Sequence, residues 1–118
     1  MAQLRVAADN SCMPAIDHVL GRPEPTRHAD VDPPPNPGVV IYWRDGCPFT
    51  ARLRFAVRHH RDRAAWVNIW EDPDGAAFVR TTNAGGHETV PTVLIDGIAH
   101  TNPDPRLVLE ALRRAPLE

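Results

Sequence analysis

The sequence predicts an α/β domain in which a mixed four-stranded sheet is flanked by helices, and three observations support this. An unbroken run of β-branched and aromatic residues at 39–43 predicts a strand buried on both faces. Strand and helix patterns then alternate along the chain, which is typical of a sheet with parallel strands. Asp96-Gly97 separates two short apolar runs, the strongest short-range signal for a β-hairpin. The predicted order over residues 38–118 is β-α-β-α-β-β-α.

The first helix is predicted to begin at Cys47, shortly after the strand Val39–Trp43. Gly46 breaks the strand pattern, and Pro48 stands at the first helical position, where its missing N–H costs nothing. Apolar residues then recur at helical spacing and predict that this helix runs to about Arg61. We therefore expect Cys47 at the N-terminal tip of a helix.

A second strand and a second helix follow. Trp66–Trp70 has the residue types of a strand, Asp72 is predicted to cap the helix, and Gly85-Gly86 is predicted to end it. Because a helix joins the first two strands, we expect these strands to lie parallel, with a right-handed crossover between them.

A hairpin and a helix complete the domain. The strands Thr92–Ile95 and Ile98–Thr101 are expected to pair antiparallel because a two-residue loop joins them. Asn102 is predicted to cap the final helix. The buried stripe of that helix is predicted to consist of Leu107, Val108, Ala111 and Leu112.

Residues 1–37 differ in composition from the rest of the chain. They hold 7 of the 13 prolines, and their apolar residues are sparse and show no sustained period. Such a segment buries too little surface to offset the entropy lost on ordering. We predict a Pro-rich, mostly disordered extension over 1–37, with a stiff polyproline-like lead-in over its last six residues, and a domain over 38–118.

The length and net charge of the chain limit the classes of function that it can have. A chain of 118 residues is sufficient for one domain, and a net charge of −2 gives no electrostatic signature of nucleic acid or membrane binding. Neither a spanning apolar segment nor a secretory signal is recognisable, so we expect a cytoplasmic protein. We also predict that it is a monomer. The two cysteines, Cys12 and Cys47, are spaced neither as a metal pair nor as a Cys-x-x-Cys pair, and we expect no metal. In a reducing cytosol both should be thiols.

Cys47 is the candidate nucleophile. A thiol at a helix N-terminus lies near unpaired N–H groups and the positive end of the helix dipole, and both stabilise a thiolate. Arg44, three residues earlier, adds a permanent positive charge. The alternative interpretation is a small buried cysteine that only packs.

Three segments carry a resemblance to a known family: Tyr42–Thr50, Thr89–Val93, and Asp96-Gly97 with Thr101–Pro103. Over residues 39–115 the chain resembles the glutaredoxins of the thioredoxin superfamily. The stretch 71–93 is especially similar to the actinobacterial mycoredoxins. The resemblance implies a thioredoxin fold and a thiol-disulfide oxidoreductase that acts on S-thiolated proteins together with a small thiol. No tightly bound cofactor is implied.

The chain departs from the family at the active-site motif. Dithiol members carry Cys-x-x-Cys, whereas this chain has Cys47-Pro48-Phe49-Thr50. Thr50 could offer a hydroxyl to the sulfur, but it cannot form a disulfide with Cys47. The reaction that remains is monothiol exchange, in which Cys47 accepts the small thiol from the substrate and a second small thiol releases it.

The resemblance also implies a binding site for the small thiol. Val90-Pro91 should be a cis peptide that faces Cys47 and offers backbone groups to the substrate. Thr101-Asn102 stands where glutaredoxins usually present Gly-Gly and then Asp, so mycothiol is favoured over glutathione. The predicted thiol-binding residues are Phe49, Thr89, Val90, Pro91, Thr101 and Asn102, and the predicted thiolate-stabilising residues are Arg44, Pro48 and Thr50.

Two other functions remain open. The first is a non-catalytic binding module that keeps the fold and has lost the second cysteine. The second is an iron–sulfur carrier, as monothiol Cys-Gly-Phe-Ser glutaredoxins are. Pro48 in place of the Gly, and the absence of a Lys before the cysteine, count against the carrier.

Overall fold

A four-stranded mixed sheet forms the centre of the structure, a computed structural model that describes residues 21–114. The strands are β1 (Val39–Trp43), β2 (Ala65–Asn68), β3 (Thr92–Ile95) and β4 (Ile98–Thr101), and their order across the sheet is β2-β1-β3-β4. β1 pairs parallel with β2 and antiparallel with β3, and β3 pairs antiparallel with β4. The predicted crossover unit and hairpin are both confirmed.

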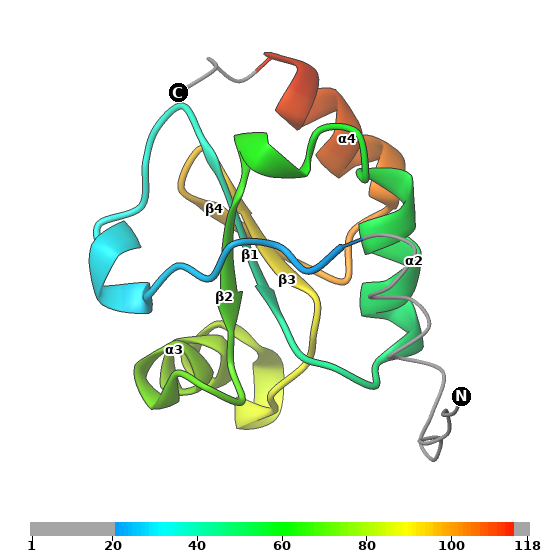
Figure 1. Cartoon of the computed structure of the whole chain (residues 1–118). Coiled ribbons are helices and arrows are strands. Elements are labelled where there is room, and N and C mark those ends of the chain that lie inside the picture. The colour runs from blue at the N-terminus through cyan, green and yellow to red at the C-terminus, as the bar shows by residue number, and fades with distance from the viewer. Residues whose placement is uncertain (1–20, 115–118) are drawn as a thin grey trace.

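Helices cover both faces of this sheet (Figure 1). The α-helices are α2 (Pro48–Ala56), α3 (Pro73–Thr82) and α4 (Pro105–Arg114), and the short 3₁₀-helices are η2 (His28–Val31), η3 (Arg61–Arg63) and η4 (Ala84–Gly86). α2 and α4 pack together on one face, whereas α3 and η2 cover the other. Within residues 21–114 no helix is long and apolar enough to cross a membrane.

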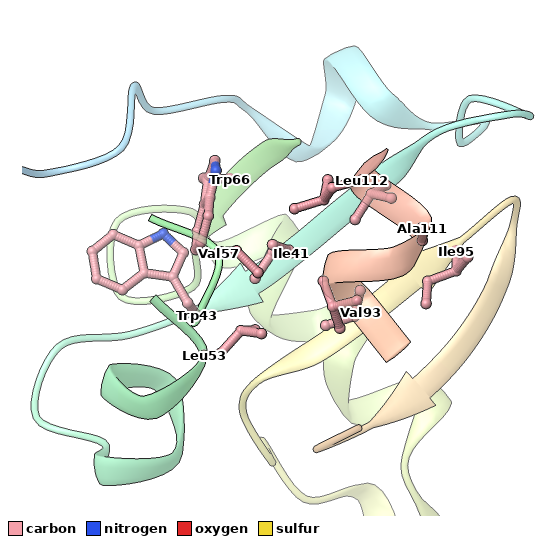
Figure 2. Close-up of a cluster of buried hydrophobic side chains, with 11 residues drawn as sticks. Ile41, Trp43, Leu53, Val57, Trp66, Val93, Ile95, Ala111 and Leu112 are labelled. Atoms are coloured by element: carbon pink, nitrogen blue, oxygen red, sulfur yellow. The ribbon is translucent and has the colours of Figure 1, made fainter. Parts of the chain in front are cut away.

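The central strand β1 explains the unbroken apolar run in the sequence. All five of its residues are buried, and alternate side chains enter two different cores. Ile41 and Trp43 face α2 and α4, and Trp43 meets Trp66 edge-on at 6.5 Å between ring centroids (Figure 2). Val40 and Tyr42 face α3 and η2. A strand covered on both sides has no polar face to alternate with.

Three elements are shorter than the sequence predicts. α3 ends at Thr82, with Asn83 as its C-cap, and the Gly85-Gly86 pair predicted to end it lies in η4. α2 ends at Ala56 rather than near Arg61, and the chain turns through the next residues into η3. β2 ends at Asn68, because the Asn68 side-chain oxygen accepts a hydrogen bond from the Trp70 backbone N–H at 2.9 Å and holds the chain in a turn. The Asp72 cap is confirmed, since its carboxylate accepts from the Gly75 N–H at 3.0 Å.

The start of the last helix corrects another prediction. α4 begins at Pro105, and Asp104 rather than Asn102 caps it, by accepting from the Arg106 backbone N–H at 2.9 Å. Asn102 lies before the helix with φ +46°. Leu107 was predicted to be buried but is 41% exposed, whereas the other three residues of the predicted stripe are buried.

The structure describes part of the predicted N-terminal extension. Residues 1–20, including Cys12, lie outside the described residues, whereas residues 21–37 lie against the domain. The Thr26 backbone N–H donates to the Trp66 carbonyl at 2.8 Å, and Val31, the last residue of η2, is buried in the core on the α3 face of the sheet. The chain bends at 32–33 and again at 36–37, so a straight polyproline-like lead-in is not formed. The domain therefore has contacts that begin before residue 38.

Candidate active site

Cys47 occupies the tip of α2, as predicted. It is the N-cap residue, with extended backbone angles, and its carbonyl accepts the first helical hydrogen bond, from the Ala51 N–H at 3.0 Å. Pro48 follows at the first helical position. The N–H groups of Phe49 and Thr50 belong to the first turn, where a helix offers no partner to its donors. The Cys47 side chain does not cap these groups.

The sulfur lies between this helix tip and the loop before β3. The Cys47 thiol donates to the Val90 carbonyl at 3.5 Å, and the residue is only 5% exposed. It packs in the core that contains Tyr42 and Ile69. Apolar burial opposes a charge on the sulfur, whereas the helix tip favours one. Burial and the helix N-terminus therefore act in opposite directions on the charge of the Cys47 sulfur.

The Val90–Pro91 peptide is cis and lies against Cys47, as the family resemblance implied. A buried polar network fixes the loop from behind. Asn83 donates to the Val79 carbonyl at 2.9 Å and to the Thr92 hydroxyl at 3.4 Å, and that hydroxyl donates to the Thr89 carbonyl at 2.6 Å. The loop is thus held by groups at the end of α3 and the start of β3.

The same network reaches the two residues predicted at the start of the last helix. The Thr101 hydroxyl donates to the Asn83 side-chain oxygen, and the Asn102 backbone N–H donates to the Pro91 carbonyl at 2.7 Å. Both residues are exposed at the edge of the site. The proton of the Thr101 hydroxyl is therefore already engaged within the protein, by the same amide that donates to Thr92.

Asn83 is the site residue that sequence reasoning missed. It is 9% exposed and bonds three separate elements, yet in the sequence it looks like an ordinary polar residue after a helix. Its position directly before Ala84-Gly85-Gly86 is the one signal that could have drawn attention to it. Only the tertiary structure reveals a buried amide whose partners are far apart in sequence.

Thr50, which stands where dithiol members carry a second cysteine, is fully buried. Its hydroxyl has no hydrogen-bond partner among the described residues. A buried hydroxyl without a partner costs about 1–3 kcal/mol. Thr50 lies one helical turn after Cys47 in the sequence, and no hydrogen bond joins its hydroxyl to the sulfur in this structure.

Arg44 and Phe49 lie on the outer side of the site. The Arg44 guanidinium donates to the Asp45 carbonyl at 3.0 Å and stacks over Trp70, with 5.4 Å from its central carbon to the ring centroid. No hydrogen bond joins Arg44 to Cys47 in residues 21–114, so any effect on the sulfur is that of a nearby charge. Phe49 is 52% exposed beside the helix tip and Trp70 is 63% exposed.

Two ionisable groups on the α3 face have shifted pKa values. Burial, with the charges of Asp32 and Asp72 adding to it, raises the pKa of Tyr42 far above its usual range. Partial burial works against ionisation of Asp72, but hydrogen bonds from the His28 and Gly75 backbone N–H groups outweigh it and lower the Asp72 pKa. No cluster of three or more His, Cys, Asp or Glu that could hold a metal ion occurs in residues 21–114.

A family model for glutaredoxins matches residues 39–99, just over half of the chain. The chain belongs to the glutaredoxin family. Its sheet and helices form the thioredoxin fold, and the matched glutaredoxin region contains both Cys47 and the cis Val90–Pro91 peptide. Family membership supports a thiol-disulfide oxidoreductase-like function in general. No curated protein matches the chain.

Proposed function

We propose that this glutaredoxin is a monothiol thiol-disulfide oxidoreductase that reduces mixed disulfides between proteins and a low-molecular-weight thiol. The observation that carries the proposal is the position of Cys47, at a helix tip and against the Val90 carbonyl. Thr50 stands where a second cysteine would be needed for an internal disulfide. Cys47 is thus the nucleophile, and the small thiol must complete the cycle.

The reaction balances with two molecules of the small thiol. The Cys47 thiolate attacks the small-thiol sulfur of the protein mixed disulfide, that disulfide breaks, and the protein thiolate leaves and takes up a proton. Cys47 now carries the small thiol as a new disulfide. A second small thiol, as its thiolate, attacks the sulfur of this adduct, which releases the oxidised small-thiol dimer and restores the Cys47 thiolate.

Donors for the charged sulfur are present at the helix tip. Loss of the thiol proton removes the bond to the Val90 carbonyl, because that carbonyl can only accept. We assign the stabilisation of the charged sulfur to the first-turn N–H groups and the buried Thr50 hydroxyl. The freed Val90 backbone can accept from an extended substrate.

Mycothiol is our proposed co-substrate, in a reducing cytoplasm and with a monomeric enzyme. The Gly-Gly-Asp pattern with which glutaredoxins usually bind glutathione is replaced by Thr101-Asn102-Pro103. The Thr101 hydroxyl donates its proton to Asn83, so it has no proton left to donate to a ligand. These differences favour a small thiol of another shape.

The test is turnover of protein mixed disulfides of mycothiol and of glutathione. We expect the wild type to reduce the mycothiol substrate faster than the glutathione one. Cys47→Ser should lose at least a hundred-fold of the rate, roughly the loss expected when a nucleophile is removed. Cys12→Ser is the matched control and should keep the wild-type rate. Equal activity of the wild type and Cys47→Ser would eliminate the proposal.

The burial of Cys47 favours one competing function, a non-catalytic binding module. A cysteine that is 5% exposed can pack without reacting, as buried cysteines generally do. Alkylation separates the two functions. A nucleophile reacts with iodoacetamide faster than a free cysteine at pH 7, whereas a packing residue reacts more slowly and only after local opening.

A further inference from the structure

Residues 21–31, which we call the N-terminal arm, lie along the edge of the sheet outside the family match. Figure 1 shows the arm in blue, crossing at β2 and leading to η2. Its start is fixed by the buried Arg54, which donates to the Gly21 carbonyl at 3.0 Å. Its middle is fixed by the Thr26 bond to Trp66 and by a bridge between Pro25 and Trp66. Arg22 therefore projects from an anchored backbone.

Arg22 meets the loop that leads into Cys47. Its two terminal nitrogens donate to the two carboxylate oxygens of Asp45 at 3.0 and 3.3 Å. Its central carbon lies 5.2 Å from the centroid of the Trp43 ring, which orients the guanidinium. Two parallel bonds between arginine and a carboxylate fix geometry better than a single contact. The Arg22 side chain is 43% exposed and that of Asp45 is 29% exposed, so solvent screens part of this pair's interaction.

Asp45 places a negative charge two residues before Cys47. An uncompensated carboxylate there would oppose a second negative charge on the sulfur. We propose that Arg22 is a positioning residue that neutralises Asp45 and so preserves the reactivity of Cys47. The inference rests on the proposed function, and it assigns a role to a residue outside the glutaredoxin match.

Several other charged groups lie near Cys47, and none of them is altered in the Arg22 and Asp45 variants that test the proposal. Arg44, in the same loop, stacks on Trp70. Several titratable and charged groups lie on the other elements packed around Cys47, namely His28, Asp30, Tyr42, Asp72, Asp74, Arg80, His87 and Glu88. Tyr42 is hydrogen bonded to His28, and Arg80 is paired with Glu88.

The experiment is the pH dependence of Cys47 alkylation by iodoacetamide, in the full chain with Cys12→Ser so that one thiol is followed. Arg22→Ala should raise the pH of half-maximal rate by about half a unit, which slows alkylation at pH 7 about three-fold. Asp45→Asn should lower that pH by a similar amount. The double variant should return close to the parent, because both charges are then absent.

Two further variants separate charge from structure. Arg22→Lys should fall between the parent and Arg22→Ala, because a lysine keeps the charge but loses the two parallel bonds. Arg27→Ala removes an exposed arginine from the same arm and should match the parent. In 1 M salt the difference between parent and Arg22→Ala should shrink, because the lost charges are partly exposed.

Each contrary result is distinct. An Arg22→Ala profile that coincides with the parent overturns the inference and leaves the proposed function intact. A shift that Asp45→Asn fails to remove also overturns it, because displacement of the arm and not the Asp45 charge would then be the cause. A parent whose Cys47 does not react at all removes the proposed function, and this inference with it.

Discussion

Two loops meet at Cys47, and they are held in different ways. The Thr89–Pro91 loop is fixed from behind by buried amide and hydroxyl groups that lie almost entirely inside the glutaredoxin match. The loop at residues 44–46 is held on its outer side by Arg22, from a segment that precedes the match. The Thr89–Pro91 loop, which we call the inner wall of the site, is therefore held by the shared fold. The loop at residues 44–46, which we call the outer wall, depends on a residue that precedes the family match.

This difference has an energetic side. Asn83 is buried, so water competes little for the hydrogen bonds of its amide. Removal of that amide would leave several polar groups without a hydrogen-bond partner. The Arg22–Asp45 pair is partly exposed, and such pairs contribute little to stability. We expect the inner wall to matter most for folding and the outer wall to matter most for the charge on the sulfur.

The largest effect should come from the inner wall. Asn83→Ala removes a buried amide that donates to the His87 carbonyl and the Thr92 hydroxyl and accepts from the Thr101 hydroxyl, and it should lower the free energy of unfolding by about 2–4 kcal/mol. Urea denaturation measures this. Thr81→Ala, an exposed site on the same helix, is the control and should change stability by less than about 0.5 kcal/mol. Equal losses in both variants would show that the network does not brace the loop.

The next prediction concerns the contribution of the N-terminal arm to stability, through His28 near its C-terminal end. The His28 ring is hydrogen bonded to the buried Tyr42 hydroxyl at 2.8 Å and packs on Phe78 with ring centroids 5.0 Å apart. His28→Ala should therefore lower the free energy of unfolding by about 2 kcal/mol. His59→Ala removes an exposed histidine and should have no measurable effect. An unchanged unfolding midpoint in His28→Ala would mean that the arm adds nothing to the fold.

Thr50, in the first turn of α2, should separate an effect on stability from an effect on reactivity. Thr50→Val removes a buried hydroxyl that has no partner among the described residues, so the free energy of unfolding should rise by about 1 kcal/mol. The same change should slow alkylation of Cys47, because a donor to the thiolate is lost. Thr50→Ser keeps the hydroxyl and should keep the rate. A Val variant that is as reactive as the wild type would contradict the role of Thr50.

The smallest effect is a pH dependence at the junction of the arm with α3. The Asp72 pKa is lowered in the folded protein, so its charged form stabilises the fold at pH values above the ordinary aspartate pKa of 3.8. That contribution is lost as the pH falls through the lowered value. In Asp72→Asn the free energy of unfolding should therefore fall less steeply as the pH is lowered, and the difference from the wild type should be less than about 1 kcal/mol. Urea denaturation at a series of acidic pH values measures it. Parallel curves for the two proteins would contradict the assignment.

Local signals explain what could be predicted from the sequence. The β1 run, the Asp96-Gly97 turn, the Asp72 cap and the position of Cys47 beside Pro48 each depend on neighbouring residues, and all are confirmed. The Asn102 cap failed because Asp104 is an equally good cap closer to the helix. Local pattern alone could not choose between them.

Contacts between distant residues account for the rest. The burial of Cys47 depends on Val90 and on core residues from other elements, so its neighbours in sequence do not reveal it. The pairing of Arg22 with Asp45 spans 23 positions and belongs to a segment whose composition indicates disorder. The family resemblance supplied the cis Val90–Pro91 peptide, which no local pattern would have predicted.

The central claim is that Cys47 itself accepts the small thiol. Mass spectrometry of the protein after reaction with a mycothiol-modified protein, without added thiol, tests this directly. We predict one mycothiol per chain, mapped to the peptide that contains Cys47 and absent from Cys47→Ser. The adduct should persist because no cysteine at position 50 can displace it. An unmodified Cys47 beside a fully reduced substrate would contradict the account.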